Sequence, residues 1–295
     1  MADNLINKIC LGTVQFGMNY GIANTTGQIP KDEAFQILEY AYAKGMRFLD
    51  TAHAYGNSEK IIGEFAENKK AAFNIISKIS LADNISEEEI EPIFLQSLER
   101  LRVKKLYAYL IHSFDDFRRD NIIWDKLKIL KERHLIEKIG LSIYRPQELE
   151  VLLDNAGGLD IIQVPYSIFD RRFEEYFSLL RKRNIEICVR SVFLQGLAFM
   201  DRDKLPHNLS GARNSLLLLK EISKENNISL NALCINFVLL NPLIDRIIIG
   251  VDGLGHLKAN IEDMYLRERV RMLEPILKGL VIKDENILLP YMWGG

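Results

Sequence analysis

The stretch KIGLSIYRPQELEVLLDNAGGLDIIQV, residues 138–164, combines two strand-like runs with one helical pattern. The runs Lys138–Ser142 and Ile161–Val164 are mostly apolar, which is typical of parallel strands covered on both faces. Between them, Pro146 suits the first turn of a helix, because that position needs no backbone N–H. The stretch therefore predicts one β-α-β unit.

The same alternation extends over nearly the whole chain. Further strand-like runs lie at Ile9–Val14, Met46–Asp50, Asn74–Lys78, Leu106–Ile111, Ile185–Val189 and Arg246–Ile249. Helical patterns separate the runs, and one of them opens with Ser86 and with Glu89 three residues later, the spacing of a capping box. The long seventh connection has room for two helices, Asn214–Ser223 and Asn231–Leu240. Eight strands in alternation with helices predict an α/β fold, a (β/α)8 TIM barrel.

A doubly wound parallel sheet is the alternative fold. Such a sheet usually carries a G-x-G-x-x-G fingerprint after its first strand, and residues 11–21, LGTVQFGMNYG, do not fit it. No linker or low-complexity segment interrupts the alternation. We therefore expect residues 1–295 to form a single barrel domain with a C-terminal tail over about residues 266–295.

Composition narrows the classes of partner. The 295 residues include 38 basic and 40 acidic side chains, a net charge of −2, which argues against a nucleic-acid binder and a polybasic membrane anchor. No apolar run reaches roughly 18 residues, so we expect no transmembrane span. The N-terminus lacks a signal-peptide pattern, and the cysteines, Cys10, Cys188 and Cys234, form no C-x-x-C pair. We expect buried thiols, a cytoplasmic protein and no metal site, and the oligomeric state stays open.

Ionisable side chains follow three successive strand-like runs. The second run ends at Asp50, the third at Lys78, and the fourth is followed by His112; Tyr55 comes five residues after Asp50. A charge at the end of an apolar strand is costly unless it is paired. Because the ends of barrel strands meet on one face, we expect these side chains to share a site.

These residue types suit the protonation of an alkoxide that forms at a carbonyl. Tyrosine has a pKa of about 10 and is a poor acid, but a nearby lysine ammonium lowers that pKa. Asp50 can hold Lys78, and His112 can donate a hydrogen bond to the carbonyl oxygen. Carbonyl reduction also needs a hydride, which no side chain supplies, so the pattern implies a nicotinamide cofactor.

With these residues in place, the sequence resembles the aldo-keto reductase family, a family of (β/α)8 barrels that use NADPH. The stretch FLDTAHAYGNSEKIIGE, residues 48–64, is similar to a family signature in which Asp and Tyr precede a G-x-S-E motif. The resemblance spans nearly the whole chain. It implies that Asp50, Tyr55, Lys78 and His112 form the catalytic tetrad, with Tyr55 as the general acid.

The cofactor motifs match less completely. The family places Ser-Asn after the fifth strand, where this chain has Ser142 and Ile143, and a Gln after the sixth, which matches Gln163. After the seventh strand, Arg190 stands where many members have an aromatic residue that stacks on the nicotinamide, and a guanidinium can also stack on a ring. The resemblance places three more residues of this loop beside the cofactor: Ser191, Leu194 and Gly196.

The last loop, IIIGVDGLGHLKANIE, resembles the family's segment for the adenosine phosphate. Alignment on Asn260 puts Gly250 and Val251 at a Lys-Ser pair and His256 at an Arg that many members use for the 2′-phosphate. Gly253 lies at a helix start that can bind phosphate, and Asn260 is implied as an adenine contact. The resemblance implies NADPH, and the missing Arg leaves NADH use open.

The leading hypothesis is an NAD(P)H-dependent oxidoreductase that reduces an aldehyde, ketone or sugar-like carbonyl of a small molecule. The alternative is a regulatory subunit of the same fold that senses bound cofactor and turns over slowly. A third reading is an aldolase that forms a Schiff base through Lys78. The sequence does not specify the substrate.

Overall fold

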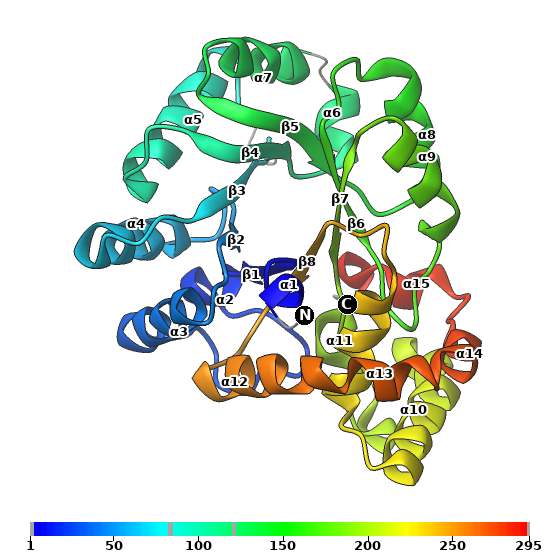
Figure 1. Ribbon diagram of the computed structural model, residues 1–295. Helices are drawn as coiled ribbons and strands as arrows, with labels where there is room; N and C mark the ends of the chain where they lie inside the picture. The colour runs from blue at the N-terminus through cyan, green and yellow to red at the C-terminus, as the bar shows by residue number, and fades with distance from the viewer. Residues whose placement is uncertain (1–2, 82–84, 120–121, 294–295) are drawn as a thin grey trace.

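Eight parallel strands close into a barrel in which each strand pairs with the next in sequence and β8 pairs with β1 (Figure 1). The structure, a computed structural model, describes residues 3–81, 85–119 and 122–293. The strands are β1 Ile9–Gly12, β2 Phe48–Asp50, β3 Asn74–Ile79, β4 Leu106–Ile111, β5 Ile136–Ser142, β6 Ile161–Pro165, β7 Glu186–Arg190 and β8 Arg246–Ile249. The predicted TIM barrel is confirmed.

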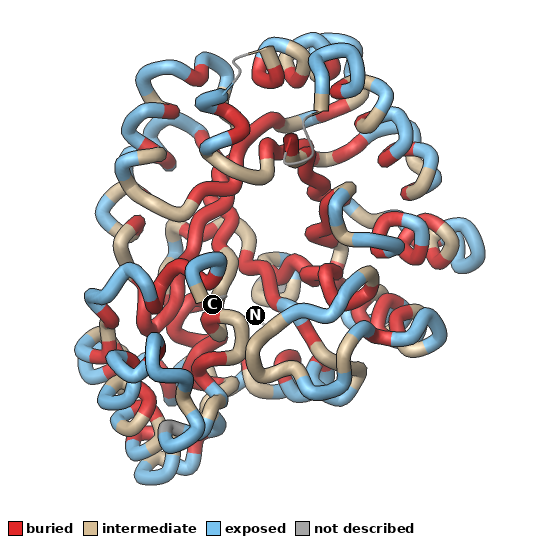
Figure 2. The backbone as a smooth tube through the Cα atoms, turned by 180° about the vertical axis from the view of Figure 1, so that it is seen from behind, coloured by how far each residue is buried: buried red, intermediate tan, exposed pale blue. Residues whose placement is uncertain are grey.

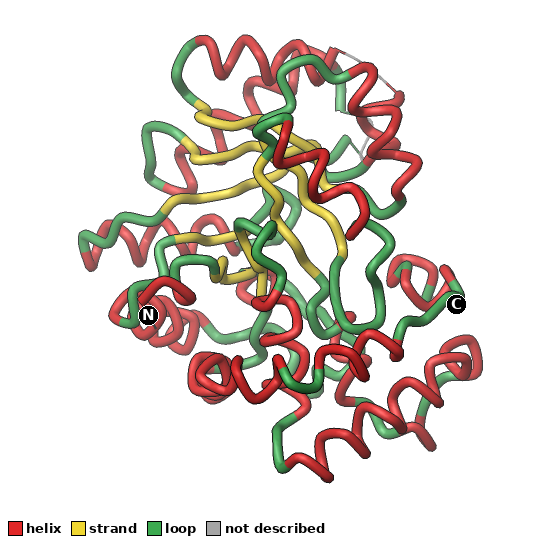
Figure 3. The backbone as a smooth tube through the Cα atoms, turned by 45° about the vertical axis from the view of Figure 1, so that its right-hand side comes forward, coloured by secondary structure: helices red, strands yellow, loops and turns green. Residues whose placement is uncertain are grey.

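Helices surround the strands on the outside of the barrel (Figure 3). The α-helices are α1 Asp3–Ile6, α2 Val14–Gly17, α3 Lys31–Ala43, α4 Ser58–Lys69, α5 Glu87–Leu101, α6 Phe114–Arg119, α7 Ile122–Glu132, α8 Pro146–Asn155, α9 Phe177–Lys182, α10 Arg213–Asn226, α11 Leu230–Leu240, α12 Leu254–Asp263, α13 Arg267–Arg271, α14 Glu274–Leu277 and α15 Glu285–Leu288. The 3₁₀ helices are η1 Glu174–Tyr176, η2 Leu194–Phe199, η3 Arg202–Lys204, η4 His207–Ala212, η5 Met264–Leu266, η6 Lys278–Leu280 and η7 Pro290–Met292. Pro146 stands in the first turn of α8, as predicted.

Strand ends differ from the predicted ranges by a few residues at some positions. The first strand stops at Gly12 instead of Val14, because α2 already begins at Val14. The second strand starts at Phe48 instead of Met46, because the Met46 backbone N–H donates to the Ala41 carbonyl at the end of α3. Apolar runs predict the core of a strand, whereas local backbone hydrogen bonds decide where it begins and ends.

Two apolar layers bury the strands on both faces. A small cluster fills the inside of the barrel and includes Cys10, Phe48, Leu110, Cys188 and Ile248. A larger cluster lies between the outer face of the strands and the surrounding helices. Figure 2 shows the strands and the inward sides of the helices as buried, and the outward sides as exposed. The thiols of all three cysteines are free and buried, as expected.

Residues 266–293 of the predicted tail fold into short helices. Helix α13 packs against α11. The Arg171 guanidinium donates to the Lys278 carbonyl at 2.7 Å, and the Ile282 backbone N–H donates to the Phe169 carbonyl at 2.9 Å. These bonds fasten the tail to the loop after β6. Across the described residues, every helix is too short or too polar to cross a membrane.

Candidate active site

The Asp50–Lys78 ion pair lies inside the barrel, at the ends of β2 and β3. Lys78 Nζ donates to Asp50 Oδ2 at 2.7 Å and to the Thr51 carbonyl at 2.9 Å, and the Lys78 side chain is 1% exposed. The second carboxylate oxygen, Oδ1, accepts from Gln163 Nε2 at 2.8 Å. Both buried charges are therefore paired and hydrogen-bonded, as burial demands.

The loop after β2 holds Tyr55 through a close crossing of two glycines. A Cβ on Gly17 would lie 1.7 Å from the Tyr55 carbonyl oxygen, and one on Gly56 would lie 2.4 Å from the Gly17 oxygen. Gly56 also has a φ of +49°, in the left-handed region. Ser58 of the G-x-S-E motif fastens the same loop to the loop after β1, because its hydroxyl donates to the Thr13 carbonyl at 2.9 Å. These contacts therefore hold the backbone of Tyr55 in place.

His112 and Lys78 flank the Tyr55 ring. The Tyr55 hydroxyl lies 3.5 Å from His112 Nε2, and Lys78 Nζ lies 5.2 Å from the centre of the ring. Burial, together with the nearby charges of Lys78 and Arg190, lowers the pKa of His112 to about 3. The imidazole is therefore uncharged near neutral pH. A hydroxyl and a neutral imidazole that face each other suit hydrogen bonding to one shared oxygen atom.

The pKa of Tyr55 differs from the expectation drawn from Lys78 alone. Burial of the hydroxyl raises this pKa most strongly, and the opposing effect of the Lys78 charge is partly cancelled by Asp50. The pKa of Lys78 is raised as well: burial, the largest single effect, lowers it, but the adjacent Asp50 carboxylate and Tyr55 together outweigh burial. Tyr55 is thus a phenol and Lys78 an ammonium group in the free protein.

A cavity of about 420 Å³ opens beside Tyr55 at the carboxyl ends of the strands. Its wall comes from the loops after β1, β7 and β8 together with strand-end residues. The sequence-predicted residues in this wall are Asp50, Tyr55, Gln163, Arg190, Ser191, Gly196, Gly250, His256 and Asn260. Residues from nearly the whole chain therefore meet around one cavity, at the end of the barrel where active sites of this fold lie.

The remaining predicted residues lie around the cavity without lining it: Lys78, His112, Ser142, Leu194 and Gly253. Lys78 is buried behind Asp50, and Ser142 at the end of β5 accepts from Arg190. Leu194 is fully buried. Gly253 precedes α12, where Glu33 approaches it.

Arg190, the last residue of β7, bridges to the end of β5. Its guanidinium donates to Ser142 Oγ at 3.2 Å, to Ser191 Oγ at 3.3 Å and to the Ile143 carbonyl at 3.0 Å. It also lies over the Tyr144 ring, 3.9 Å from the centre. These acceptors are neutral. Within the described residues no carboxylate pairs with Arg190, so its positive charge faces the cavity uncompensated.

Two loops meet across the outer side of the cavity. Gln195 Nε2 donates to the Tyr20 hydroxyl at 2.7 Å, and the Ile22 backbone N–H donates to the Gln195 carbonyl at 3.1 Å. The loop after β7 contains the left-handed residues Ser191, Leu194 and Gln195, with φ values of 61°, 47° and 52°. Such strain in non-glycine residues is concentrated at functional sites in proteins.

Sequence reasoning missed several residues of the cavity wall. Gln15 in α2, Tyr20 in the loop after α2 and Asp252 after β8 line the cavity, although none was assigned a role. Gln15 Nε2 donates to Asp252 Oδ1 at 3.3 Å. A signal existed for both partners, because each is a polar residue within three positions of the end of a predicted strand.

The cavity wall contains polar groups that can hydrogen-bond a ligand. Gln15 is 7% exposed, and its Oε1 is buried without a hydrogen-bond partner among the described residues. At Gly250, a Cβ would meet Gln15 Nε2 at 3.1 Å, so a larger residue would crowd this wall. An orphaned acceptor and a narrow glycine-lined wall are consistent with a nucleotide cofactor. No group of three or more metal-ligating side chains occurs in the described segments.

Comparison with known proteins assigns the class. Residues 8–270 match the model of the "Aldo/keto reductase family". The chain therefore belongs to the aldo/keto reductase family of oxidoreductases, as the sequence motifs predicted. Enzymes of this family use NAD(P)H and act on small carbonyl compounds.

Individual relatives are distant. The oxidoreductase YqkF of Bacillus subtilis is 24% identical, over 95% of this chain and 93% of its own. The "NADH-specific methylglyoxal reductase" of Escherichia coli is 29% identical, over 72% of this chain and 71% of its own. Among solved structures, an aldo-keto reductase of Bacillus halodurans in its holo form has a TM-score of 0.70 at 21% identity, covering 90% of this chain and 91% of that chain. That likeness supports the fold alone.

Proposed function

We propose that this protein reduces the carbonyl group of a small aldehyde, ketone or sugar-like compound with NADPH or NADH, and that Tyr55 is the proton donor. The observation that carries the proposal is the pairing of the Tyr55 hydroxyl with His112 Nε2, 3.5 Å apart, beside the buried Asp50–Lys78 pair. These two groups can together bind one carbonyl oxygen.

The proposed mechanism divides the work among the four side chains. In the tautomer that carries its proton on Nε2, neutral His112 donates to the carbonyl oxygen and orients it. Tyr55 donates to the same oxygen and transfers its proton as negative charge develops there. The Lys78 ammonium, 5.2 Å from the Tyr55 ring centre, stabilises the phenolate that remains, and Asp50 holds Lys78 in place. The cofactor supplies the hydride when it is bound.

The cleft residues would hold the cofactor. Gln163 is hydrogen-bonded to Asp50, and Arg190 lines the same cavity. Arg190 has five N–H groups, of which three are used by the neutral acceptors described above. We propose that a remaining N–H of Arg190 replaces the amide that Ile143 lacks. The residues proposed for the rest of the cofactor are Ser191, Leu194, Gly196, Gly250, Gly253, His256 and Asn260.

The ion pair argues against the aldolase alternative. A Schiff base requires a neutral lysine amine, whereas Asp50 raises the pKa of Lys78 despite its burial. Lys78 is therefore better suited to an electrostatic role than to nucleophilic attack.

A carbonyl panel tests the proposed function. With excess NADH or NADPH, purified protein should oxidise the cofactor over many turnovers, as followed by cofactor absorbance. Methylglyoxal, glyceraldehyde and an aromatic aldehyde are suitable first substrates, because relatives are named for methylglyoxal, glycerol and aryl-alcohol chemistry. A single slow turnover of bound cofactor would instead favour the regulatory alternative.

Tyr55→Phe supplies the matched variant. It should lower kcat by about a thousandfold, because it removes the proton donor. The dissociation constant of the cofactor should stay unchanged. Full reductase activity in this variant would show that Tyr55 is not the acid.

A further inference from the structure

We propose that Asp252 and Glu33 make the adenosine end of the cleft selective for NADH over NADPH. The inference rests on the proposed function, since it concerns the same cleft and its nicotinamide cofactor. The adenosine end of the cleft lies at the loop after β8 and the start of α12 in this proposal. The two cofactors differ there by a 2′-hydroxyl in NADH and a 2′-phosphate in NADPH.

The cavity wall at this end presents hydrogen-bond acceptors. Asp252 lines the cavity, and its carboxylate accepts from Gln15 Nε2 at 3.3 Å. The other amide atom, Gln15 Oε1, is buried and without a partner in the described part of the chain. A ribose hydroxyl can donate a hydrogen bond to such acceptors. A phosphate offers only acceptor oxygens and negative charge, so it is a poor match.

A second carboxylate already occupies the start of α12. The Leu254 backbone N–H, the first of the helix, donates to Glu33 Oε1 at 3.1 Å. The same oxygen would lie 2.8 Å from a Cβ on Gly253, so the carboxylate is packed directly against this glycine. Helix starts favour anions, and Glu33 fills that role here. A 2′-phosphate would have to compete with it.

Positive charge is scarce at this end of the cleft. Of the described residues that line the cavity, Arg190 is the only lysine or arginine, and it belongs to the loop after β7. Lys258 on α12 lies over the Tyr40 ring, 5.5 Å from its centre. His256 is 66% exposed, and its Nδ1 lies 3.7 Å from Asp252 Oδ2. This end of the cavity therefore has the Asp252 carboxylate in its wall, the Glu33 carboxylate on the first N–H of α12 and the exposed imidazole of His256.

Titration calorimetry with NADH and NADPH separately tests the selectivity without any turnover. We expect NADH to bind at least about tenfold more tightly at low ionic strength, because like charges face each other in the NADPH complex. Added salt should reduce the difference in affinity between NADH and NADPH, because it screens the repulsion between the carboxylates and the 2′-phosphate. ADP-ribose and its 2′-phosphate should show the same order, because neither contains the nicotinamide.

Isosteric variants assign the selectivity to the two carboxylates. Asp252→Asn combined with Glu33→Gln keeps one acceptor oxygen on each side chain and removes both charges. NADPH should then bind about tenfold more tightly than it does to the unmodified chain, and NADH affinity should change by less than about threefold. Asp32→Asn, an exposed carboxylate beside Glu33 on α3, is the matched control and should leave the ratio unchanged.

The outcomes separate this inference from the proposed function. Equal or tighter binding of NADPH by the unmodified chain would overturn the selectivity and leave the proposed function standing. An unchanged ratio in the double variant, or the same change in Asp32→Asn, would overturn the assignment to Asp252 and Glu33. Binding of neither cofactor would overturn both proposals.

Discussion

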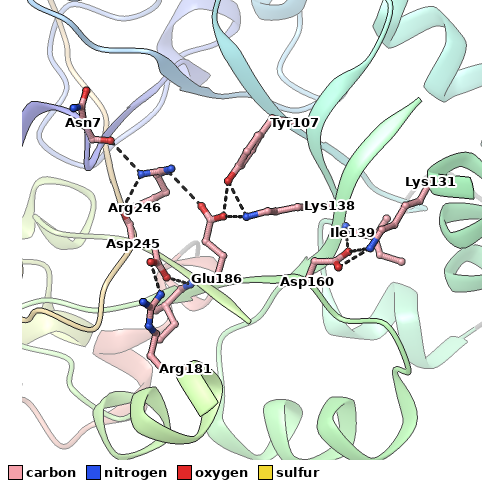
Figure 4. Close-up of polar contacts among 11 residues, drawn as sticks. Asn7, Tyr107, Lys131, Lys138, Ile139, Asp160, Arg181, Glu186, Asp245 and Arg246 are labelled. Carbon is pink, nitrogen blue, oxygen red and sulfur yellow. Dashed lines mark hydrogen bonds and ion pairs between the residues drawn. The ribbon is translucent and has the colours of Figure 1, made fainter. Parts of the chain in front are cut away.

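At the mouth of the barrel, Asp50 holds Lys78 beside Tyr55; at the opposite end, where the strands begin, Glu186 holds Lys138 beside Tyr107 (Figure 4). Each end also has an arginine stacked on an aromatic ring. Arg190 lies 3.9 Å from the centre of the Tyr144 ring, and Arg246 lies 3.7 Å from that of Phe48. We call the second group, Tyr107, Lys138, Glu186 and Arg246, the floor network.

The charged groups of the floor network pair with one another. The Tyr107 hydroxyl donates to Glu186 and accepts from Lys138 Nζ at 2.9 Å, Lys138 also pairs with Glu186, and Arg246 Nε lies 3.3 Å from Glu186 Oε1. At the mouth, by contrast, the Tyr55 hydroxyl has one long contact, and Arg190 faces neutral acceptors within the described residues. The same residue types therefore pair with one another at the floor of the barrel. At the mouth, they keep hydrogen-bonding groups that a ligand can use.

Figure 4 shows the same pattern in two neighbouring carboxylates at the starts of strands. Asp160 accepts from the Ile139 backbone N–H at 2.9 Å and pairs with Lys131, and Asp245 accepts from the Ile187 N–H at 2.9 Å and pairs with Arg181. These carboxylates stabilise strand starts and leave little capacity for a ligand. Position along the strand, more than residue type, therefore separates structure from chemistry in this barrel.

The largest difference should appear when each lysine is removed. Lys78→Met leaves the buried Asp50 carboxylate with Gln163 as its remaining side-chain donor, so we expect a loss of about 3–5 kcal/mol in the free energy of unfolding. Lys138→Met should cost about 1 kcal/mol, because Lys138 is partly exposed and Glu186 keeps Tyr107 and Arg246. Urea unfolding of both variants measures the difference. Equal losses in the free energy of unfolding would show that the two ion pairs contribute equally to stability.

Removing each tyrosine hydroxyl should give opposite results. Tyr107→Phe breaks two hydrogen bonds to charged groups and should destabilise the fold by about 1–2 kcal/mol while the carbonyl reductase rate is retained. Tyr55→Phe loses one long contact, so stability should change by less than about 0.5 kcal/mol although the reaction slows by about a thousandfold. Urea unfolding and steady-state kinetics on both variants test this, and loss of activity in Tyr107→Phe alone would reverse the assignment.

The sequence predicts much of the mouth and little of the floor. Asp50, Lys78 and His112 each follow an apolar run, and a parallel barrel brings such ends together. Glu186 and Arg246 begin strands, where a charge is ordinarily exposed, so their sequence context does not reveal that they are partners. Sequence also cannot show that Gln15 and Asp252, 237 positions apart, are hydrogen-bonded.

The acidity of Tyr55 shows why local reasoning about the site fell short. One neighbour, Lys78, predicts a lowered pKa, but burial and Asp50 act in the opposite direction once the chain is folded. The hydrogen bonds of Arg190 also depend on the folded chain and cannot be predicted from neighbouring residues in the sequence. Its partners Ser142 and Ile143 come from a strand that is not adjacent to β7 in the barrel, so only the closed fold brings them together.

The smallest expected effect is on the pH dependence of stability. It also distinguishes the two ends of the barrel, because the mouth contains an uncharged histidine whereas the floor network has none. The pKa of His112 is lowered to about 3 by burial and by the charges of Lys78 and Arg190, against 6.5 for the free side chain. Below pH 6.5 the unfolded chain binds a proton at His112 that the folded chain does not, so stability is lost as pH falls from 6.5 towards 3. The full linkage slope is about 1.4 kcal/mol per pH unit, and since the His112 side chain is partly exposed we expect a slope of about 0.5–1 kcal/mol per pH unit. His112→Gln should remove this part of the pH dependence in urea unfolding between pH 7 and 4, and His207→Gln, at an exposed histidine, should retain it. Parallel profiles for the unmodified chain and His112→Gln would mean that His112 takes up its proton equally in both states, and that the mouth is as well solvated as the surface.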